Sequence, residues 1–113
     1  MKIRVLNFWG LPMKTPDECR TIEEVRSEID RIDRAIIEAI AQRRGYVHAV
    51  MQFKRSAEDV HAHERQRQML AVRRAWAEEH TLSPELVEKL FRSMVDHFIA
   101  EELALLQARN GAG

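Results

Sequence analysis

Two cations stand on a helical stripe where apolar side chains are expected. Steps of three and four residues place side chains on one helix face, and here they connect Ile29, Ile32, Ile36, Ile40, Arg43, Val47, Val50 and Lys54. An unpartnered buried charge costs several kcal/mol, so a folded chain rarely keeps one without an anion. We therefore expect a pocket for a negatively charged small molecule, with Arg43 and Lys54 binding it and Val47 and Val50 between them.

The spacing of these two cations suggests the shape of the ligand. On a continuous helix, the Cα atoms of Arg43 and Lys54 would lie about 16 Å apart. Long side chains that lean toward each other could hold a molecule about 8 Å long from both ends. Arginine binds carboxylates in a bidentate manner, whereas lysine is a compact point donor.

Charges interrupt two later apolar stripes as well. Arg65 stands one step before Met69, Val72 and Trp76, and Glu102 stands between Phe98 and Leu105. Arg26 is rotated by about 100° from Arg43 and could reach a pocket only if its helix packs on a second copy. Other interpretations stay open: each charge can snorkel to water, and Glu102 can simply form a salt bridge with Lys54.

Three helices are expected to position these residues, so the fold class is all-α. Thr21 and Glu24 form a capping box before a long helix over about residues 22–55. Residues 56–63 are expected to form a loop, and a short helix follows over residues 64–79. Ser83 and Pro84 begin a medium helix that ends near residue 108.

The long helix is the strongest sequence argument for a dimer. It would span about 50 Å, whereas a compact chain of this size has a radius of gyration of about 13–14 Å. A second copy of the chain is the simplest cover for its far end. Outside the helical domain of residues 13–108, we expect an irregular extension over residues 1–12 and a flexible tail over residues 109–113.

The composition excludes several classes of protein. The 113 residues include 18 Lys and Arg against 18 Asp and Glu, so the broad positive field used to bind nucleic acid or acidic membranes is missing. No apolar run is long enough for a membrane span. Cys19 is the single cysteine, which fits a reducing compartment, and a cytoplasmic protein is expected. His61 and His63 lack a third ligand, so neither a metal nor another cofactor is expected.

With these residues identified, the chain resembles the all-helical, AroQ-type chorismate mutase family over about residues 13–108. The resemblance is carried by Ile29-Asp-Arg-Ile-Asp33, Ala41-Gln-Arg43, Phe53-Lys54, Glu64-Arg65 and a polar residue near the end of the third helix. Within the family the chain looks most similar to the isochorismate-pyruvate lyases, through residues 13–19, Tyr46-Val47 and residues 74–79.

The resemblance implies an intertwined homodimer with two equivalent active sites and no cofactor. Arg26 would reach the substrate from the partner subunit, while Arg43, Lys54 and Arg65 would hold the carboxylates and the ether oxygen of dianionic chorismate or isochorismate. Lys54, Glu102 and Arg43 would be the catalytic residues. The reaction would be the pericyclic rearrangement of chorismate to prephenate, or hydrogen transfer within isochorismate that yields salicylate and pyruvate.

Two sets of signals disagree on which reaction dominates. Glu102 matches a position that is glutamine in many members and glutamate in some mutases, which puts chorismate mutase first. Ala62, Gln66 and Phe98 resemble the lyases instead. A non-catalytic dimerisation or regulatory module is a further alternative. Because an ionised Glu102 would repel charge on the ether oxygen, it must be protonated to donate, and activity should rise toward acid pH.

Overall fold

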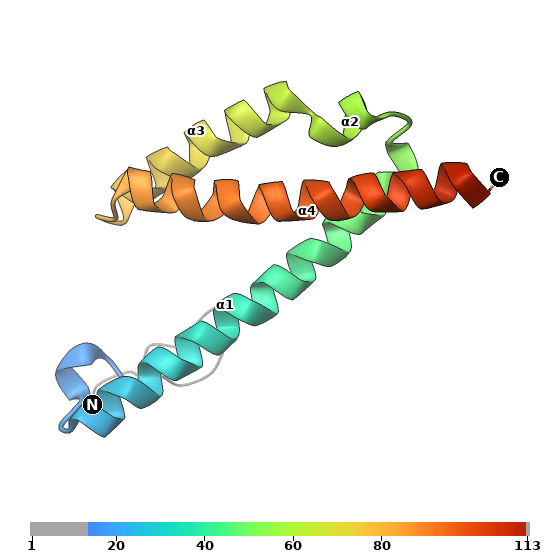
Figure 1. The fold of residues 1–113 in the computed structure, drawn as a ribbon. Coiled ribbons are helices and arrows are strands. Elements are labelled where there is room, and N and C mark those ends of the chain that lie inside the picture. The colour runs from blue at the N-terminus through green and yellow to red at the C-terminus, as the bar shows by residue number, and fades with distance from the viewer. Residues whose placement is uncertain (1–13, 113) are drawn as a thin grey trace. The chain divides into compact units, whose positions relative to one another are not determined.

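A computed structural model describes residues 14–112, and every regular element in that range is helical. The all-α class is therefore confirmed for this part of the chain, while the extension predicted over residues 1–12 lies outside the described residues. In order along the chain, the elements are η1 (Pro16–Glu18), α1 (Ile22–Val50), η2 (Met51–Phe53), α2 (Ala57–His61), α3 (His63–Glu79) and α4 (Pro84–Ala112) (Figure 1).

The start of α1 follows the predicted capping box in one of its two halves. The Thr21 hydroxyl accepts a hydrogen bond from the Glu24 N–H at 3.1 Å. The Glu24 carboxylate accepts from the Arg20 N–H at 2.8 Å, one residue earlier than a standard box requires. The bond from Arg20, together with the Lys14 ammonium at 3.0 Å, holds the pKa of Glu24 below its ordinary value.

The end of α1 differs from the prediction. The α-helix stops at Val50, η2 forms one tighter turn, and Lys54 is extended (φ −91°, ψ 133°). The prediction of a helix through residue 55, with Lys54 on its stripe, was therefore wrong. The reason is a second helix start: Ser56 accepts from the Asp59 N–H at 3.2 Å, and the Asp59 carboxylate accepts from the Arg55 N–H at 2.8 Å.

The chain divides after Arg43 into two units. The described part of the first unit holds η1 and most of α1, and its apolar stripe is exposed in the single chain. Ile36, on the stripe, is 51 % exposed, and Ile37 beside the stripe is 67 % exposed. The other exposed apolar residues on this part of α1 are Ile22, Val25, Ile29, Ile32 and Ile40. This stripe is therefore available to a second element or a second chain.

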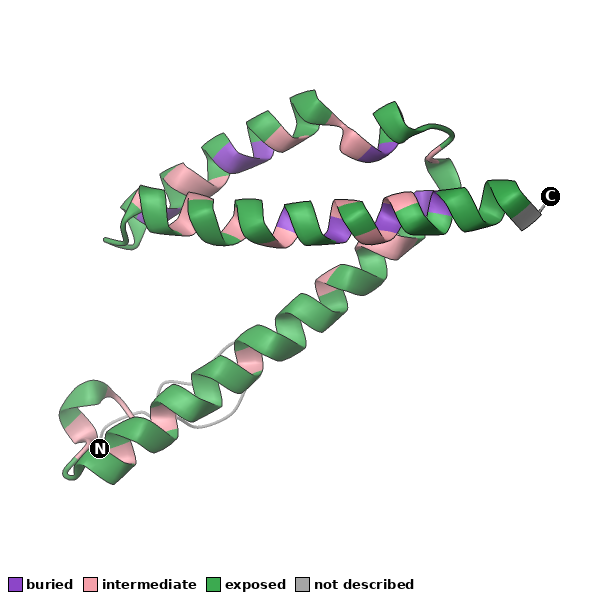
Figure 2. Ribbon diagram, in the orientation of Figure 1, coloured by how far each residue is buried: buried purple, intermediate pink, exposed green. Residues whose placement is uncertain are grey.

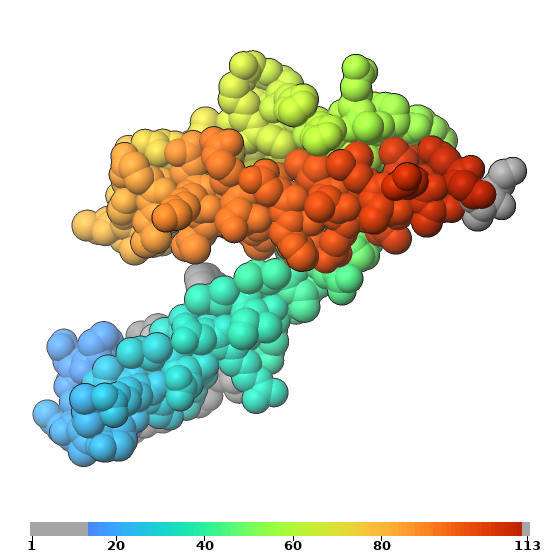
Figure 3. Space-filling model, in the orientation of Figure 1, coloured from blue at the N-terminus to red at the C-terminus, as the bar shows by residue number. Residues whose placement is uncertain are grey.

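In the second unit, α2 and α3 pack along α4 (Figure 2; Figure 3). One buried cluster contains Met51, Val60 and Leu106, and another contains Met69, Leu70 and Val95; Ile99 packs against both. On α4 the buried positions Val95, Phe98, Glu102 and Leu106 share one face. The predicted stripe is confirmed, except that Leu106 replaces Leu105 at its end.

The loop predicted over residues 56–63 contains α2, so that prediction was wrong over five residues. Ala62 ends α2 in the left-handed region (φ 44°, ψ 52°), and α3 begins directly after it, as predicted to within one residue. Ser83 is confirmed as the cap of α4, because its hydroxyl accepts from the Leu86 N–H at 3.2 Å.

The third predicted helix, α4, extends beyond its predicted end near residue 108. It continues to Ala112 and has 29 residues, the same length as α1. Arg109 lies in the added turn and donates hydrogen bonds to the segment after α1. This tertiary contact could not be predicted from the local sequence.

Candidate active site

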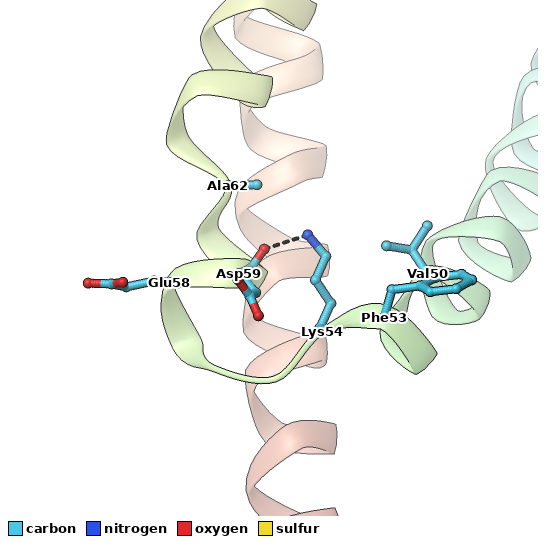
Figure 4. A pocket seen from close by; sticks show the side chains of 6 residues that line it. All are labelled: Val50, Phe53, Lys54, Glu58, Asp59 and Ala62. Carbon is cyan, nitrogen blue, oxygen red and sulfur yellow. Dashed lines mark hydrogen bonds between the residues drawn. The ribbon is translucent and has the colours of Figure 1, made fainter.

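A hollow of about 430 Å³ lies beside the turn that carries Lys54 (Figure 4). Its lining residues are Val50, Phe53, Lys54, Glu58, Asp59 and Ala62. Its volume falls within the range of roughly 300–1,000 Å³ that is usual for small-molecule sites. Val50 and Lys54 were predicted to contact a ligand, and the structure brings these two together in one wall.

The Lys54 ammonium sits at the surface of this hollow. Its Nζ donates a hydrogen bond to the carbonyl oxygen of Asp59. In Figure 4 the side chain extends between Val50 and Phe53 on one side and Asp59 and Ala62 on the other, while Glu58 points away. An ammonium has three N–H donors. Lys54 can therefore keep its bond to Asp59 and still donate to an anion in the hollow.

The backbone of Lys54 is held from two directions. Its N–H donates to the carbonyl of Met51 at 3.1 Å, which closes η2. Its own carbonyl accepts from Nη2 of Arg109 at 2.7 Å. The position of the catalytic candidate thus depends on a local turn and on a residue from the far end of α4.

Glu102 is the one buried charged residue among residues 14–111, with 7 % of its surface exposed. It lies on α4 between Phe98 and Leu106, as its place in the stripe predicted. It is not among the residues that line the hollow. Burial of a carboxyl group is tolerated when the group is neutral or paired. The catalytic role of Glu102 stays a prediction.

The remaining predicted ligands lie in different environments. Arg65 is exposed in the first turn of α3 and does not line the hollow, and Val47 is half-buried on α1. In the unit that ends at Arg43, Arg26 is exposed and Arg43 is half-buried. Their roles in binding also stay predictions.

Comparison with known proteins identifies the family. The family model described as chorismate mutase type II matches residues 25–103. The chain belongs to the type II chorismate mutase family. The chain is also 40 % identical to the isochorismate pyruvate lyase of Pseudomonas aeruginosa PAO1 over 100 residues, which is 88 % of this chain and 99 % of that protein.

A cluster of titratable side chains around Glu101 was not predicted from the sequence of this type II chorismate mutase family member. The Glu101 carboxylate lies 3.2 Å from Nε of Arg44, 3.3 Å from Nε2 of His48 and 2.7 Å from Nε2 of His97. Desolvation acts to raise the pKa of Glu101, but the hydrogen bonds from Arg44, His97 and His48 outweigh it and hold that pKa below its ordinary value. The spacing of four residues within 44–48 and 97–101 was the available signal.

Asp59 and Phe53 were also missed as lining residues of the hollow. The pattern Ser56-x-x-Asp59 signals a helix start and would have placed Asp59 at the turn.

Within residues 14–112, no group of three or more His, Cys, Asp and Glu side chains could hold a metal ion; His61 and His63 stack with ring centroids 5.2 Å apart. In the same range, no helix is long and apolar enough to cross a bilayer.

Proposed function

We propose that the chain is an enzyme that acts on a chorismate-type dianion, and that its main reaction converts isochorismate to salicylate and pyruvate. The observation that carries this choice is the 40 % identity to the Pseudomonas isochorismate pyruvate lyase, which extends over 99 % of that protein. Ala62, Gln66 and Phe98, where the chain differs from well-studied mutases, support the same choice. Ala62 lines the hollow beside Lys54, and Phe98 is buried on α4.

The proposed reaction needs no covalent intermediate. The bond between the ring and the ether oxygen of isochorismate breaks, and one ring hydrogen moves to the terminal carbon of the enolpyruvyl group. That group leaves as pyruvate, and the ring becomes aromatic. Holding the flexible substrate in the required folded pose supplies the entropic part of the barrier.

In this proposal, electrostatic stabilisation of the transition state lowers the rest of the barrier. In this proposal Arg43 and Arg65 bind the substrate carboxylates, and Val47 and Val50 contact the apolar parts of the substrate. Negative charge builds on the ether oxygen as the C–O bond lengthens, and Lys54 donates to it. Such a donor acts most strongly in a site from which water is excluded.

We further propose that the active form is a homodimer in which Arg26 enters the partner's site. The exposed apolar stripe on α1 supports this, because an amphipathic helix normally buries that face. The exposure of Arg26 in the single chain is compatible with this, since Arg26 is the residue expected to reach the substrate from the partner subunit. The resemblance to the intertwined AroQ dimers points in the same direction. A cytoplasmic location stays a prediction from the sequence.

Chorismate mutase activity is the second candidate, and Glu102 is the observation that favours it. A neutral buried carboxyl at this position can donate a hydrogen bond to the ether oxygen of chorismate, as a glutamine does in many family members. Sequence alone put this reaction first. We rank it second because of the extent of identity to a lyase, and one site can serve both reactions because both substrates are similar dianions.

Two assays on the purified chain test the proposal. Fluorescence follows salicylate formed from isochorismate, and ultraviolet absorbance follows the loss of chorismate. We expect turnover of isochorismate, with slower or no conversion of chorismate. Turnover of chorismate alone would support the mutase instead. If neither substrate is converted, the enzyme proposal is contradicted and the non-catalytic module becomes the better account.

A further inference from the structure

Arg109 connects the end of α4 to the turn that carries Lys54. Its Nη1 donates to the carbonyl of Met51 at 3.1 Å, and its Nη2 donates to the carbonyl of Lys54 at 2.7 Å. Met51 begins η2 and Lys54 caps it. One guanidinium therefore bonds to both ends of the turn, from a residue 58 and 55 positions away in the sequence.

The chemistry of this contact suits arginine in particular. Carbonyl groups at the end of a helix carry partial negative charge. The Met51 carbonyl already accepts from the Lys54 N–H, and its second lone pair can accept from Arg109. The planar guanidinium presents several donors in a fixed fork, so it can bond to two carbonyls at once. A lysine at the same position has one flexible ammonium and matches this geometry less well.

The two ends of the turn differ in how they are otherwise held. Met51 is 8 % exposed and packs in the core with Val60 and Leu106. Lys54 lies outside that core, and its carbonyl accepts from Arg109. Loss of Arg109 would therefore release the Lys54 end of the turn more than the Met51 end.

We propose that Arg109 is a positioning residue for Lys54: it fixes the backbone of the turn against α4, so that the Lys54 ammonium stays at the wall of the hollow. The effect on catalysis rests on the proposed function, whereas the effect on the turn itself does not. Arg109 does not line the hollow, so it acts through Lys54 and not on the substrate.

The test compares Arg109→Ala with a control on the same helix. Arg92 is an exposed arginine of α4 whose Nη2 lies 3.3 Å from the Glu88 carboxylate, one turn away. A displacement of about 1 Å at a catalytic group can cost roughly a hundredfold in rate. We expect Arg109→Ala to lower kcat about 10- to 100-fold with a smaller change in KM. Arg92→Ala should retain the kcat of the unmodified chain, and Arg109→Lys should recover part of the loss.

Hydrogen exchange gives a second readout that needs no activity. In Arg109→Ala, backbone amides of residues 52–56 should exchange faster than in Arg92→Ala, while amides of α3 exchange equally in both. If the unmodified chain converts neither substrate, the proposed function fails and exchange alone decides this inference. Equal exchange rates at residues 52–56 in Arg109→Ala and Arg92→Ala overturn the inference in every case. If the unmodified chain is active, an unchanged kcat in Arg109→Ala overturns it as well.

Discussion

At the scale of single residues, Lys54 carries the most weight in the account. Its ammonium lies at the hollow and is held by the carbonyl of Asp59, so it is partly ordered before a ligand arrives. An ordered donor does not have to reorganise when charge develops on the substrate. Preorganisation of this kind is what makes one cation effective in a pericyclic reaction.

Replacing Lys54 with alanine should therefore reduce turnover sharply. We expect kcat/KM to fall roughly 100- to 1,000-fold, equivalent to about 3–4 kcal/mol of transition-state stabilisation. The control is Arg55→Ala, because Arg55 is an exposed neighbour whose bond to the Asp59 carboxylate uses its backbone N–H, which the substitution retains. A loss below tenfold in Lys54→Ala, or an equal loss in Arg55→Ala, would contradict this role.

Glu102 gives a pH-dependent prediction at the same scale. Only the protonated carboxyl can donate to the ether oxygen, so kcat/KM should rise as the pH falls from neutrality. Glu102→Gln keeps a donor and removes the titration, so its profile should be flatter. The measurement is a pH–rate curve of both forms over the same range. If the two curves have the same shape, Glu102 does not act as a proton-dependent donor.

At the scale of elements, the Glu101 cluster joins the last two turns of α1 to α4. Arg44 and His48 come from α1, and His97 comes from α4 together with Glu101. The folded state lowers the pKa of Glu101, so it favours the ionised carboxylate. The stabilisation is therefore present above the unfolded-state pKa and is lost as the pH falls through the folded-state pKa.

The lowered pKa of Glu101 predicts how a neutral substitution at this position changes thermal stability with pH. Glu101→Gln should lower Tm at pH 7, and its difference from the unmodified chain should shrink toward about pH 3, below the usual glutamate pKa of about 4.3. Thermal unfolding followed by circular dichroism measures this. Glu79→Gln, at the exposed end of α3, serves as the control and should change Tm little at any pH. If the Tm difference between Glu101→Gln and the unmodified chain is the same at every pH, the effect of Glu101 is not electrostatic.

Helix starts were easier to predict from the sequence than helix ends. The hydroxyls of Thr21 and Ser83 cap helices as their sequence context indicates, because capping depends on residues three positions apart. The end of α1 was missed because the apolar spacing continues past Val50 while Ser56 and Asp59 start a new helix. The last turn of α4 was missed because Arg109 bonds to residues more than fifty positions away.

At the scale of the whole molecule, the exposed apolar stripe on α1 is a candidate interface for a second chain. Seven isoleucine and valine residues of this helix are exposed between positions 22 and 40. A contiguous apolar surface of this kind commonly marks an interface. The sequence indicated the cations one by one, but spacing along one chain could not show how a site is completed if, as proposed, Arg26 enters it from a second chain.

An acidic substitution in the stripe should therefore break the proposed dimer. We expect the unmodified chain to have twice the 13.2 kDa chain mass in solution. Ile36→Asp should shift it toward the monomer mass, since a buried unpaired carboxylate is costly. Ser27→Asp adds the same charge at an exposed polar site of α1 and should leave the mass unchanged. Analytical ultracentrifugation distinguishes these outcomes, and an unmodified chain that is monomeric would contradict the interface.

The most direct test of a site shared between two chains is complementation between two inactive variants. Arg26→Ala and Lys54→Ala should each be nearly inactive alone, because every site in either homodimer lacks one cation. After unfolding and refolding together, half of the dimers are mixed, and each mixed dimer has one intact site. Salicylate fluorescence should then recover to about a quarter of the unmodified activity. No recovery, in a sample that contains mixed dimers by mass, would contradict the account.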